Sequence, residues 1–205
     1  MSMRRLIAAP SRAVWTVVAV ALTTLAAVGG TAGAAGAAPA DPPGGGIYAG
    51  TYFIENEWSH RCLDERSQDG KVSGAKVQIY DCLGDPEQLW DLYLLPGGNG
   101  HTYQLVNEWS GNCLDAQLTS INRNGTVVQD YQCFGAAQTN QLWNVPLVSG
   151  SPVWITNMWT GFTSPWPDTL DEDNSHGDIN EAKVQLWQFV PGGINQEWRV
   201  EVDHY

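Results

Sequence analysis

The sequence predicts an all-β protein built from three copies of one unit of short strands. Only 16% of the residues are charged, and the chain contains 22 glycines and 10 tryptophans, a balance typical of loop-rich β proteins. Within each copy, apolar residues alternate with polar ones, which is typical of strands that bury one face. Beyond residue 40, no stretch shows the apolar period of 3.6 that an amphipathic helix needs.

The first forty residues differ in composition from the rest, and we interpret them as a secretory signal peptide. A basic start contains three of the ten basic residues: Arg4, Arg5 and Arg12. An apolar run follows over 13–28, and residues 38–40 (Ala-Pro-Ala) have the small-x-small pattern of a cleavage site. We expect cleavage near 37–40 and a secreted, extracellular protein. Sixteen residues are short for a membrane span, which needs about 18 apolar residues, so an uncleaved anchor is the alternative.

The chain that remains after cleavage is strongly acidic. It has 165 residues, of which seven are basic and 22 acidic, a net charge of −15. Because phosphate contacts need clustered Lys and Arg, no nucleic-acid partner is expected, and an anionic membrane surface is disfavoured for the same reason. This length suits one compact domain. We place the domain at 48–205, after a flexible Pro/Gly-rich segment over 41–47, with no membrane insertion after signal cleavage.

Three stretches of the chain carry the same motifs in the same order, and such repeats decide the fold. Asn-Glu-Trp-Ser occupies 56–59 and 107–110, with a looser copy at 157–160. A Leu-Asp pair follows in each stretch and ends at Asp64, Asp115 and Asp171. Each unit closes with Gln-x-Trp: Gln88-Leu89-Trp90, Gln141-Leu142-Trp143 and Gln196-Glu197-Trp198. We place the three repeats at about residues 51–95, 101–147 and 152–203.

Each repeat is expected to contain about four strands, twelve in all. A glutamine lies fourteen residues after each aspartate and an aromatic residue two later: Gln78 and Tyr80, Gln129 and Tyr131, Gln185 and Trp187. Residues i and i+2 of a strand share one face, so each pair is expected to line one surface. Opening strands are predicted at 52–54, 103–106 and 153–155.

Turn signals stand at equivalent places in the repeats. Ser73-Gly74 and Asn124-Gly125 are hairpin-type turns. Repeat three has Asn180-Glu181 there, so a different turn is expected in it. Asn124-Gly125-Thr126 also matches a glycosylation sequon, which we interpret as turn chemistry.

The four cysteines follow the repeats. Cys62 and Cys82 are twenty residues apart, and so are Cys113 and Cys133. Four cysteines allow three connectivities, and the repeat favours Cys62–Cys82 and Cys113–Cys133 because equivalent positions should pair alike. A zinc site would need CxxC spacing, which is absent. Repeat three has Thr169 and Phe189 at these positions, so no third disulfide is expected.

Taken together, these motifs resemble those of the ricin B-type lectin domain, also classed as a ricin-type carbohydrate-binding module. The resemblance covers about residues 48–203 and rests on three copies of Gln-x-Trp in register with Leu-Asp. It implies a β-trefoil, in which three four-stranded units pack about a pseudo-threefold axis. It also implies one shallow sugar pocket per unit, without catalytic residues, cofactor or metal.

In this family, the aspartate accepts hydrogen bonds from sugar hydroxyls and the strand aromatic stacks on the sugar ring. An asparagine before the Gln-x-Trp glutamine adds a polar contact, and that glutamine orients the aspartate. The carbohydrate-binding residues implied are Asp115, Gln129, Tyr131, Asn140 and Gln141 in repeat two; Asp171, Gln185, Trp187, Asn195 and Gln196 in repeat three; and Asp64, Gln78, Tyr80 and Gln88 in repeat one.

The three implied pockets are not equal. Repeat two is complete, whereas repeat three carries six extra residues that include Phe162 and Trp166. In repeat one Glu87 replaces the asparagine, and a carboxylate accepts hydrogen bonds but donates none. Binding is therefore expected to be strongest in repeat two, then in three, then in one.

Two further patterns have structural interpretations. Trp90, Trp143 and Trp198 recur at one strand position and are expected in the core. The acidic stretch 168–178 departs from a calcium loop, since His176 stands where that loop needs glycine. We expect a solvated acidic loop there.

The favoured function is a secreted, non-catalytic lectin for galactose- or xylose-type oligo- or polysaccharides, acting alone or beside secreted glycoside hydrolases. A trefoil that binds or inhibits a protein partner, such as a protease, is the first alternative. A small glycosidase with paired carboxylates is the second. No nucleophile–base motif supports catalysis among the histidines and serines considered: His60, His101, Ser59 and Ser110.

Overall fold

The structure is a computed structural model that describes residues 45–119, 121, 124–159 and 167–202. The expected signal peptide, Phe162 and Trp166 lie outside the described residues. All described residues belong to one compact unit. No helix in these described ranges has both the length and the apolar character needed to cross a bilayer.

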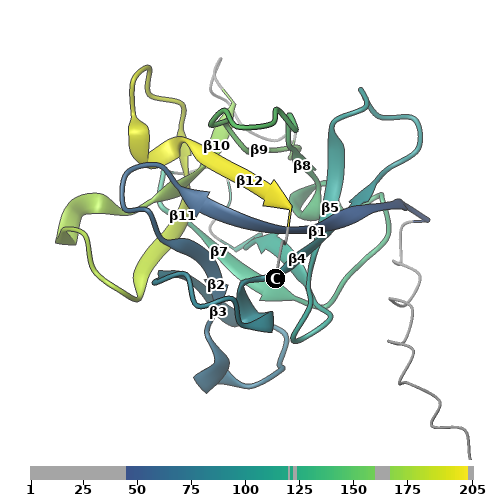
Figure 1. Cartoon of the computed structure of the whole chain (residues 1–205). Helices are drawn as coiled ribbons and strands as arrows, with labels where there is room; N and C mark the ends of the chain where they lie inside the picture. The colour runs from purple at the N-terminus through teal and green to yellow at the C-terminus, as the bar shows by residue number, and fades with distance from the viewer. Residues whose placement is uncertain (1–44, 120, 122–123, 160–166, 203–205) are drawn as a thin grey trace, which may run out of the picture. The chain divides into compact units, whose positions relative to one another are not determined.

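Twelve strands are present in the described chain, four in each repeat (Figure 1). Repeat one contains β1 (Ile47–Asn56), β2 (Cys62–Glu65), β3 (Ala75–Tyr80) and β4 (Trp90–Leu94). Repeat two contains β5 (Thr102–Asn107), β6 (Cys113–Ala116), β7 (Thr126–Tyr131) and β8 (Trp143–Asn144). Repeat three contains β9 (Thr156–Asn157), β10 (Asp168–Glu172), β11 (Ala182–Gln188) and β12 (Trp198–Val202).

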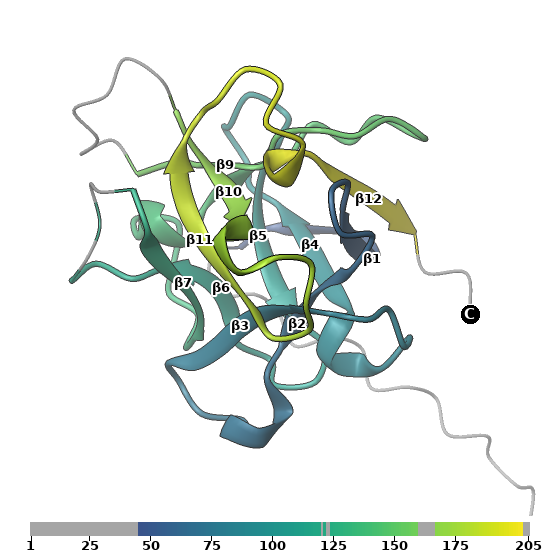
Figure 2. The ribbon, with the colours of Figure 1, turned by 90° about the vertical axis from the view of Figure 1, so that its left-hand side faces the viewer.

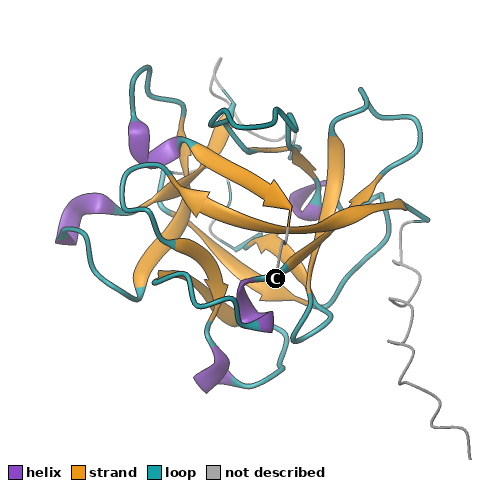
Figure 3. Ribbon diagram, viewed as in Figure 1, coloured by secondary structure: helices purple, strands orange, loops and turns teal. Residues whose placement is uncertain are grey.

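Five short 3₁₀ turns lie in the loops around this strand framework (Figure 3). They are η1 (Ser67–Asp69), η2 (Pro86–Gln88), η3 (Thr139–Gln141), η4 (Asn174–His176) and η5 (Ile194–Gln196). Each repeat therefore places its Gln-x-Trp glutamine at the end of a 3₁₀ turn, and its last strand begins at the tryptophan two residues later. The all-β expectation is confirmed.

The first and last strands of each repeat form a closed ring. Within the ring, β1 pairs with β4, β4 with β5, β5 with β8, and β8 with β9. A bridge between Val153 and Trp198 links the start of repeat three to β12, and β12 pairs with β1 over five residue pairs. These antiparallel contacts close the ring.

The two middle strands of each repeat form one hairpin, and each of the three hairpins pairs with the other two. Each hairpin is one antiparallel pair: β2 with β3, β6 with β7, and β10 with β11. The second strands of the hairpins also pair among themselves, β3 with β7, β7 with β11, and β11 with β3. Figure 2 shows these three strands side by side.

The expected opening strand at 153–155 is wrong. Val153 makes only the isolated bridge to Trp198, and the strand is β9, at Thr156–Asn157. The apolar residues of this segment do not pair as a strand. Ile155 is fully buried in the core, whereas Trp154 is 44% exposed. The other two predicted opening strands lie within β1 and β5.

The sequence predicted a different turn in repeat three, and this prediction is wrong. The turn has the same form as those of the other two repeats. Gly74, Gly125 and Glu181 all have positive φ, at 92°, 86° and 66°. Each N–H donates to a carbonyl of the next hairpin, from Gly74 to Asp130, from Gly125 to Leu186 and from Glu181 to Ile79, at 2.7–2.9 Å. This contact between repeats holds Glu181 in a left-handed conformation that glutamate rarely adopts.

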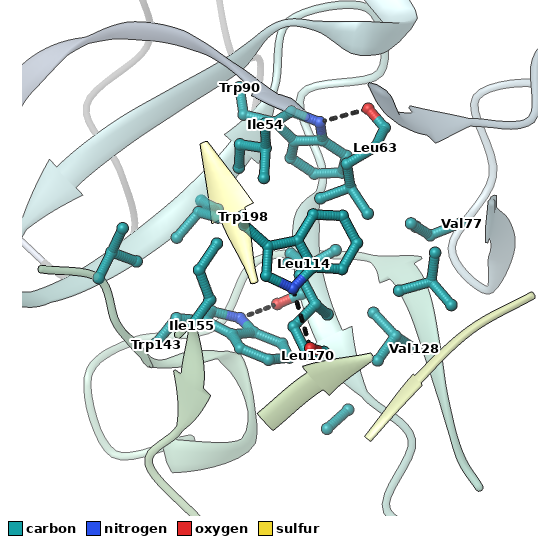
Figure 4. Close-up of a cluster of buried hydrophobic side chains, with 14 of the residues drawn as sticks. Ile54, Leu63, Val77, Trp90, Leu114, Val128, Trp143, Ile155, Leu170 and Trp198 are labelled. Carbon is teal, nitrogen blue, oxygen red and sulfur yellow. Dashed lines mark hydrogen bonds between the residues drawn. The ribbon is translucent and has the colours of Figure 1, made fainter. Parts of the chain in front are cut away.

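The core lies inside the ring and is centred on Trp90, Trp143 and Trp198, each fully buried, as predicted (Figure 4). Each indole N–H donates to the backbone carbonyl of the leucine before the repeat's aspartate, at 2.9–3.0 Å: Leu63, Leu114 and Leu170. A buried indole N–H needs such a partner. The bonds fix the strand that carries the aspartate against the strand that follows Gln-x-Trp.

Two disulfides join Cys62 to Cys82 and Cys113 to Cys133, the pairing that the repeat predicts. Each lies between the aspartate-bearing strand and the loop after the strand aromatic. In repeat three Phe189 takes the place of the second cysteine and packs edge-on against Trp154, with ring centroids 5.0 Å apart. Aromatic packing thus occupies the place of a covalent link.

Candidate functional site

Three hollows open on the surface, one on each repeat, and we call them pockets 1, 2 and 3. Pocket 1 has a volume of about 210 Å³, pocket 2 about 410 Å³ and pocket 3 about 290 Å³. The repeat's aspartate, strand glutamine and strand aromatic line each pocket: Asp64, Gln78 and Tyr80; Asp115, Gln129 and Tyr131; Asp171, Gln185 and Trp187. Residues about fourteen apart in sequence meet because the two hairpin strands pair, so that Asp115 lies opposite Gln129.

In pocket 2, three amide groups hold the Asp115 carboxylate. Gln129 donates to Oδ1 at 2.9 Å, while Asn140 and Gln141 donate to Oδ2 at 2.8 and 3.0 Å. Asn140 also donates to the carbonyl of Ala116 at 3.1 Å. A carboxylate offers about four acceptor sites, so about one remains for a ligand. The amides fix the direction in which that site points.

Pocket 3 repeats this arrangement around Asp171. Gln185 donates to Oδ1 at 2.9 Å, and Asn195 and Gln196 donate to Oδ2 at 2.9 and 3.0 Å. Lys183 adds a bond from Nζ to Oε1 of Gln185 at 3.0 Å. The aspartate of the third repeat is therefore positioned as firmly as that of the second.

Pocket 1 lacks one of these donors. Gln78 and Gln88 donate to Asp64 at 2.8 and 3.2 Å, and Glu87 lines the pocket where the other repeats have asparagine. Asp85 lines it as well. The negative charges of Glu87 and Asp85 disfavour the ionised form of Asp64, and they leave pocket 1 more acidic than pocket 2.

Burial shifts the titration of all three aspartates. Desolvation raises the pKa of Asp64 and of Asp171 to about 6, and it raises the pKa of Asp115, while the amide donors act in the opposite direction. A buried carboxylate is costly unless hydrogen-bonded. With pKa values of about 6, Asp64 and Asp171 are mostly ionised at neutral pH and accept hydrogen bonds from hydroxyl groups.

Two predicted site residues, Gln88 and Gln141, do not line their pockets. Both are fully buried behind the aspartate. Besides binding Asp115, Gln141 donates to the carbonyl of Gln132 at 2.9 Å and accepts from the N–H of Phe134 at 2.8 Å. These glutamines therefore position both the aspartate and the loop that forms the pocket rim.

The rim residues on that loop were missed by the sequence analysis. Leu83, Phe134 and Val190 line pockets 1, 2 and 3 and are 61%, 40% and 41% exposed. Each lies nineteen residues after its aspartate, and this recurrence of an apolar residue was the available signal. Each pocket thus has a second apolar surface beside its strand aromatic.

The sequence predicted a solvated acidic loop over 168–178, and this prediction is wrong for the first part of the stretch. Asp168, Asp171 and Glu172 are buried in β10. The exposed part is the segment after Asp173, where Asp178 forms an ion pair with Arg61. Across the residues described, no three His, Cys, Asp or Glu side chains are placed to hold a metal ion.

The side chain of Asn124 has a structural partner. Its Oδ1 accepts from the N–H of Gln188 at 2.8 Å. At the equivalent turn positions, Ser73 accepts from Gln132 and Asn180 accepts from Asp81. The interpretation of the sequon as turn chemistry agrees with these contacts.

Comparison with known proteins agrees with this geometry. Residues 41–131 match the family model described as "Ricin-type beta-trefoil lectin domain-like". These residues belong to a ricin-type β-trefoil lectin-like domain. The resemblance inferred from the repeated motifs is confirmed, and repeat three extends the same four-stranded unit to residue 202. A sequence search against curated proteins finds no match.

Solved structures share the fold of the ricin-type domain. The designed threefold-symmetric protein ThreeFoil is 26% identical, with a TM-score of 0.61 over 74% of this chain and 97% of its own. The Macrolepiota procera ricin B-like lectin, solved with lactose, is 18% identical, with a TM-score of 0.56 over 75% and 95%. The fold is therefore a β-trefoil.

A third similar structure belongs to a much longer protein. The exo-β-1,3-galactanase 1,3Gal43A from Clostridium thermocellum is 21% identical, with a TM-score of 0.63 over 76% of this chain. The chain spans only 30% of that enzyme. The ricin-type fold thus occurs both as a whole protein and as part of a larger one.

Proposed function

We propose that the protein is a secreted, non-catalytic lectin that binds galactose- or xylose-type glycans. The observation that carries the proposal is the Asp115 carboxylate, held by three amides beside the half-buried ring of Tyr131. A pyranose presents vicinal hydroxyls and an apolar C–H face, so it needs a fixed acceptor beside a flat apolar surface. A charged acceptor makes the stronger hydrogen bond, and a preorganised one lowers the ordering cost of binding.

Two similar proteins support the choice of galactose. The Macrolepiota procera lectin was solved with lactose, and the Clostridium thermocellum enzyme is a galactanase. Single shallow pockets of this kind are expected to bind with millimolar dissociation constants, about −4 kcal/mol each. Three pockets on one rigid body raise the avidity for a repeating polysaccharide. The protein would act alone or beside secreted glycoside hydrolases.

The two disulfides of the domain support secretion. Disulfides such as Cys62–Cys82 persist in oxidising compartments and are rare in the cytosol. The segment 1–40 supplies the expected export signal. Western blotting of the culture medium, with N-terminal sequencing of the mature chain, tests secretion and the cleavage near 37–40.

Retention on immobilised galactan, xylan and lactose tests sugar binding. We expect Asp115→Ala to weaken retention strongly while the unfolding temperature changes little. Glu201→Ala, at an exposed position of β12, is the matched control and should bind as the unaltered protein does. Absence of retention on all three matrices would overturn the proposal, and release of reducing sugar would overturn its non-catalytic part.

A further inference from the structure

Pocket 2 differs from the other two pockets in size and in chemistry. We propose that it binds two consecutive residues of a neutral glycan, and that Phe134 is the platform for the second sugar ring. This inference rests on the proposed function and refines it for one pocket. Pockets 1 and 3 would then hold one sugar residue each.

The shape of pocket 2 is the first observation. Its volume of about 410 Å³ compares with about 290 Å³ in pocket 3 and about 210 Å³ in pocket 1. At the rim position, pocket 2 has the ring of Phe134, whereas pockets 3 and 1 have Val190 and Leu83. Among the described residues that line the three pockets, only those of pocket 2 combine the strand aromatic with a second flat ring.

The two rings are arranged to share a ligand. The centroids of Tyr131 and Phe134 lie 6.1 Å apart, and the ring planes are tilted by 34°. Trp154 and Phe189, in contrast, pack edge-on at 78°, so that the edge of one ring covers the other. The planes of Tyr131 and Phe134 are closer to parallel than those of this pair, and Phe134 remains 40% exposed.

Phe134 is held in place before any ligand arrives. Its N–H donates to Oε1 of Gln141 at 2.8 Å, and its carbonyl accepts from Nε2 of Gln104 at 2.7 Å. The preceding residue, Cys133, is tied by its disulfide to Cys113. A rigid platform loses little conformational entropy on binding. In the other repeats, Phe53 and Trp154 stand at the position of Gln104, so this amide contact belongs to pocket 2.

The remaining walls of pocket 2 favour a neutral ligand. Among the described residues that line pocket 2, Asp115 is the one charged residue, and Leu118 supplies a further apolar wall. Polar residues, Ser67 and Asn174, line pockets 1 and 3 at the position of Leu118. Amide side chains at the rim, Gln117 and Gln138, are suited to hydroxyl groups.

Calorimetric titration of the full chain tests the inference. Asp64→Ala and Asp171→Ala together silence pockets 1 and 3, so that binding reports pocket 2. The probes are galactose against β-1,3-galactobiose, and xylose against xylobiose. We expect the disaccharide to bind about tenfold more tightly than its monosaccharide, the effect of one added aromatic contact. Phe134→Ala should remove this gain and leave monosaccharide affinity within about twofold.

Val148→Ala, made in the same background, is the matched control and should change neither affinity, because Val148 is exposed and lines none of the three pockets. If the two substitutions at the aspartates prevent folding, NMR titration of the unaltered protein replaces them. The backbone amide signal of Phe134 should then shift with the disaccharide and stay in place with the monosaccharide.

Three outcomes overturn the inference while the proposed lectin function stands. The first is equal affinity for mono- and disaccharide, and the second is an equal loss of both in Phe134→Ala. The third is a gain obtained with N-acetylgalactosamine alone, which would assign Phe134 to an acetyl group rather than to a second ring. Absence of any sugar binding by the unaltered protein would overturn the lectin function and this inference together.

Discussion

The side-chain amide of Asn140 donates to Oδ2 of Asp115 at 2.8 Å, a contact for which pocket 1 has no counterpart. Asn195 makes the same bond to Asp171 in pocket 3 at 2.9 Å. In pocket 1 the residue is Glu87, whose carboxylate repels Asp64 instead of donating to it. This one position accounts for the weakest of the three expected sites.

Glu87→Asn is therefore expected to improve pocket 1. The new amide supplies the missing donor, and removal of the charge lowers the pKa of Asp64. With pockets 2 and 3 silenced by Asp115→Ala and Asp171→Ala, we expect affinity for lactose or xylobiose to rise about threefold to tenfold, the value of one hydrogen bond. Calorimetric titration measures this change.

The reciprocal substitution provides the control for pocket 2. Asn140→Glu places a carboxylate against Asp115, so binding by pocket 2 should fall by at least about tenfold. A gain or no change in Asn140→Glu would contradict the role given to the amide. Thermal unfolding of both variants separates this effect from a loss of fold.

Glu181→Gly should stabilise the protein. Glu181 holds φ at 66° because its N–H is bonded to Ile79, and a left-handed conformation costs a non-glycine residue about 1–2 kcal/mol. Glycine removes this strain but makes the unfolded chain more flexible, so we expect a net gain of about 1 kcal/mol. Urea unfolding measures it.

Gly74→Ala gives the opposite test at the equivalent turn. A Cβ there meets open space apart from Gln129 at 4.0 Å, so steric clash is absent and only the backbone strain remains. We expect a loss of about 1 kcal/mol. A stabilised Gly74→Ala, or a destabilised Glu181→Gly, would show that strain at this turn does not limit stability.

The repeats made most of the fold predictable. The number of strands, the core tryptophans and both disulfides depend on patterns that recur in register, and the structure places them as expected. The turn at Glu181 was not predictable, because its conformation is imposed by a contact with Ile79, about one hundred residues away in the chain. The burial of Asp168 and Glu172 was also not predicted. It depends on neighbouring strands that only the folded chain brings together, whereas the sequence shows only that the side chains are charged.

The sequence predicted only those pocket residues that belong to the repeated motif. The aspartate, glutamine and aromatic of each repeat meet because they recur at fixed spacing on paired strands. Phe134 was missed although an apolar residue recurs at its position, because its counterparts Leu83 and Val190 are aliphatic and the search for sugar-binding residues considered only aromatic ones. The buried position of Gln141 follows from its three partners at the rim and floor, which only the folded chain brings together.

Acid should weaken sugar binding by pocket 3. Burial raises the pKa of Asp171 to about 6, so the carboxylate is ionised at pH 7.5 and takes up a proton as the pH falls through 6. The neutral acid loses the charge-assisted bond to a hydroxyl. With pockets 1 and 2 silenced, we expect affinity to fall about tenfold between pH 7 and pH 5. Titrations across pH 4.5–8 measure this, and a constant affinity would contradict the assignment of Asp171 as the acceptor.

Glu65→Gln is expected to stabilise the protein at alkaline pH. Glu65 and Asp130 are fully buried, and both carboxyl oxygens of Glu65 and one of Asp130 lack a hydrogen-bond partner in the part of the chain described. Burial and the neighbouring Asp130 raise the pKa of Glu65. A group whose pKa is raised in the folded state contributes stability that is fully present below its unfolded-state pKa. This contribution is lost as the pH rises through the folded-state pKa. The amide of Glu65→Gln would donate to Asp130, so stability at pH 9 should rise by about 1 kcal/mol and its decline from pH 6 should flatten. Glu201→Gln, at an exposed position of β12, is the control, and a similar gain there in urea unfolding would refute the special state of Glu65.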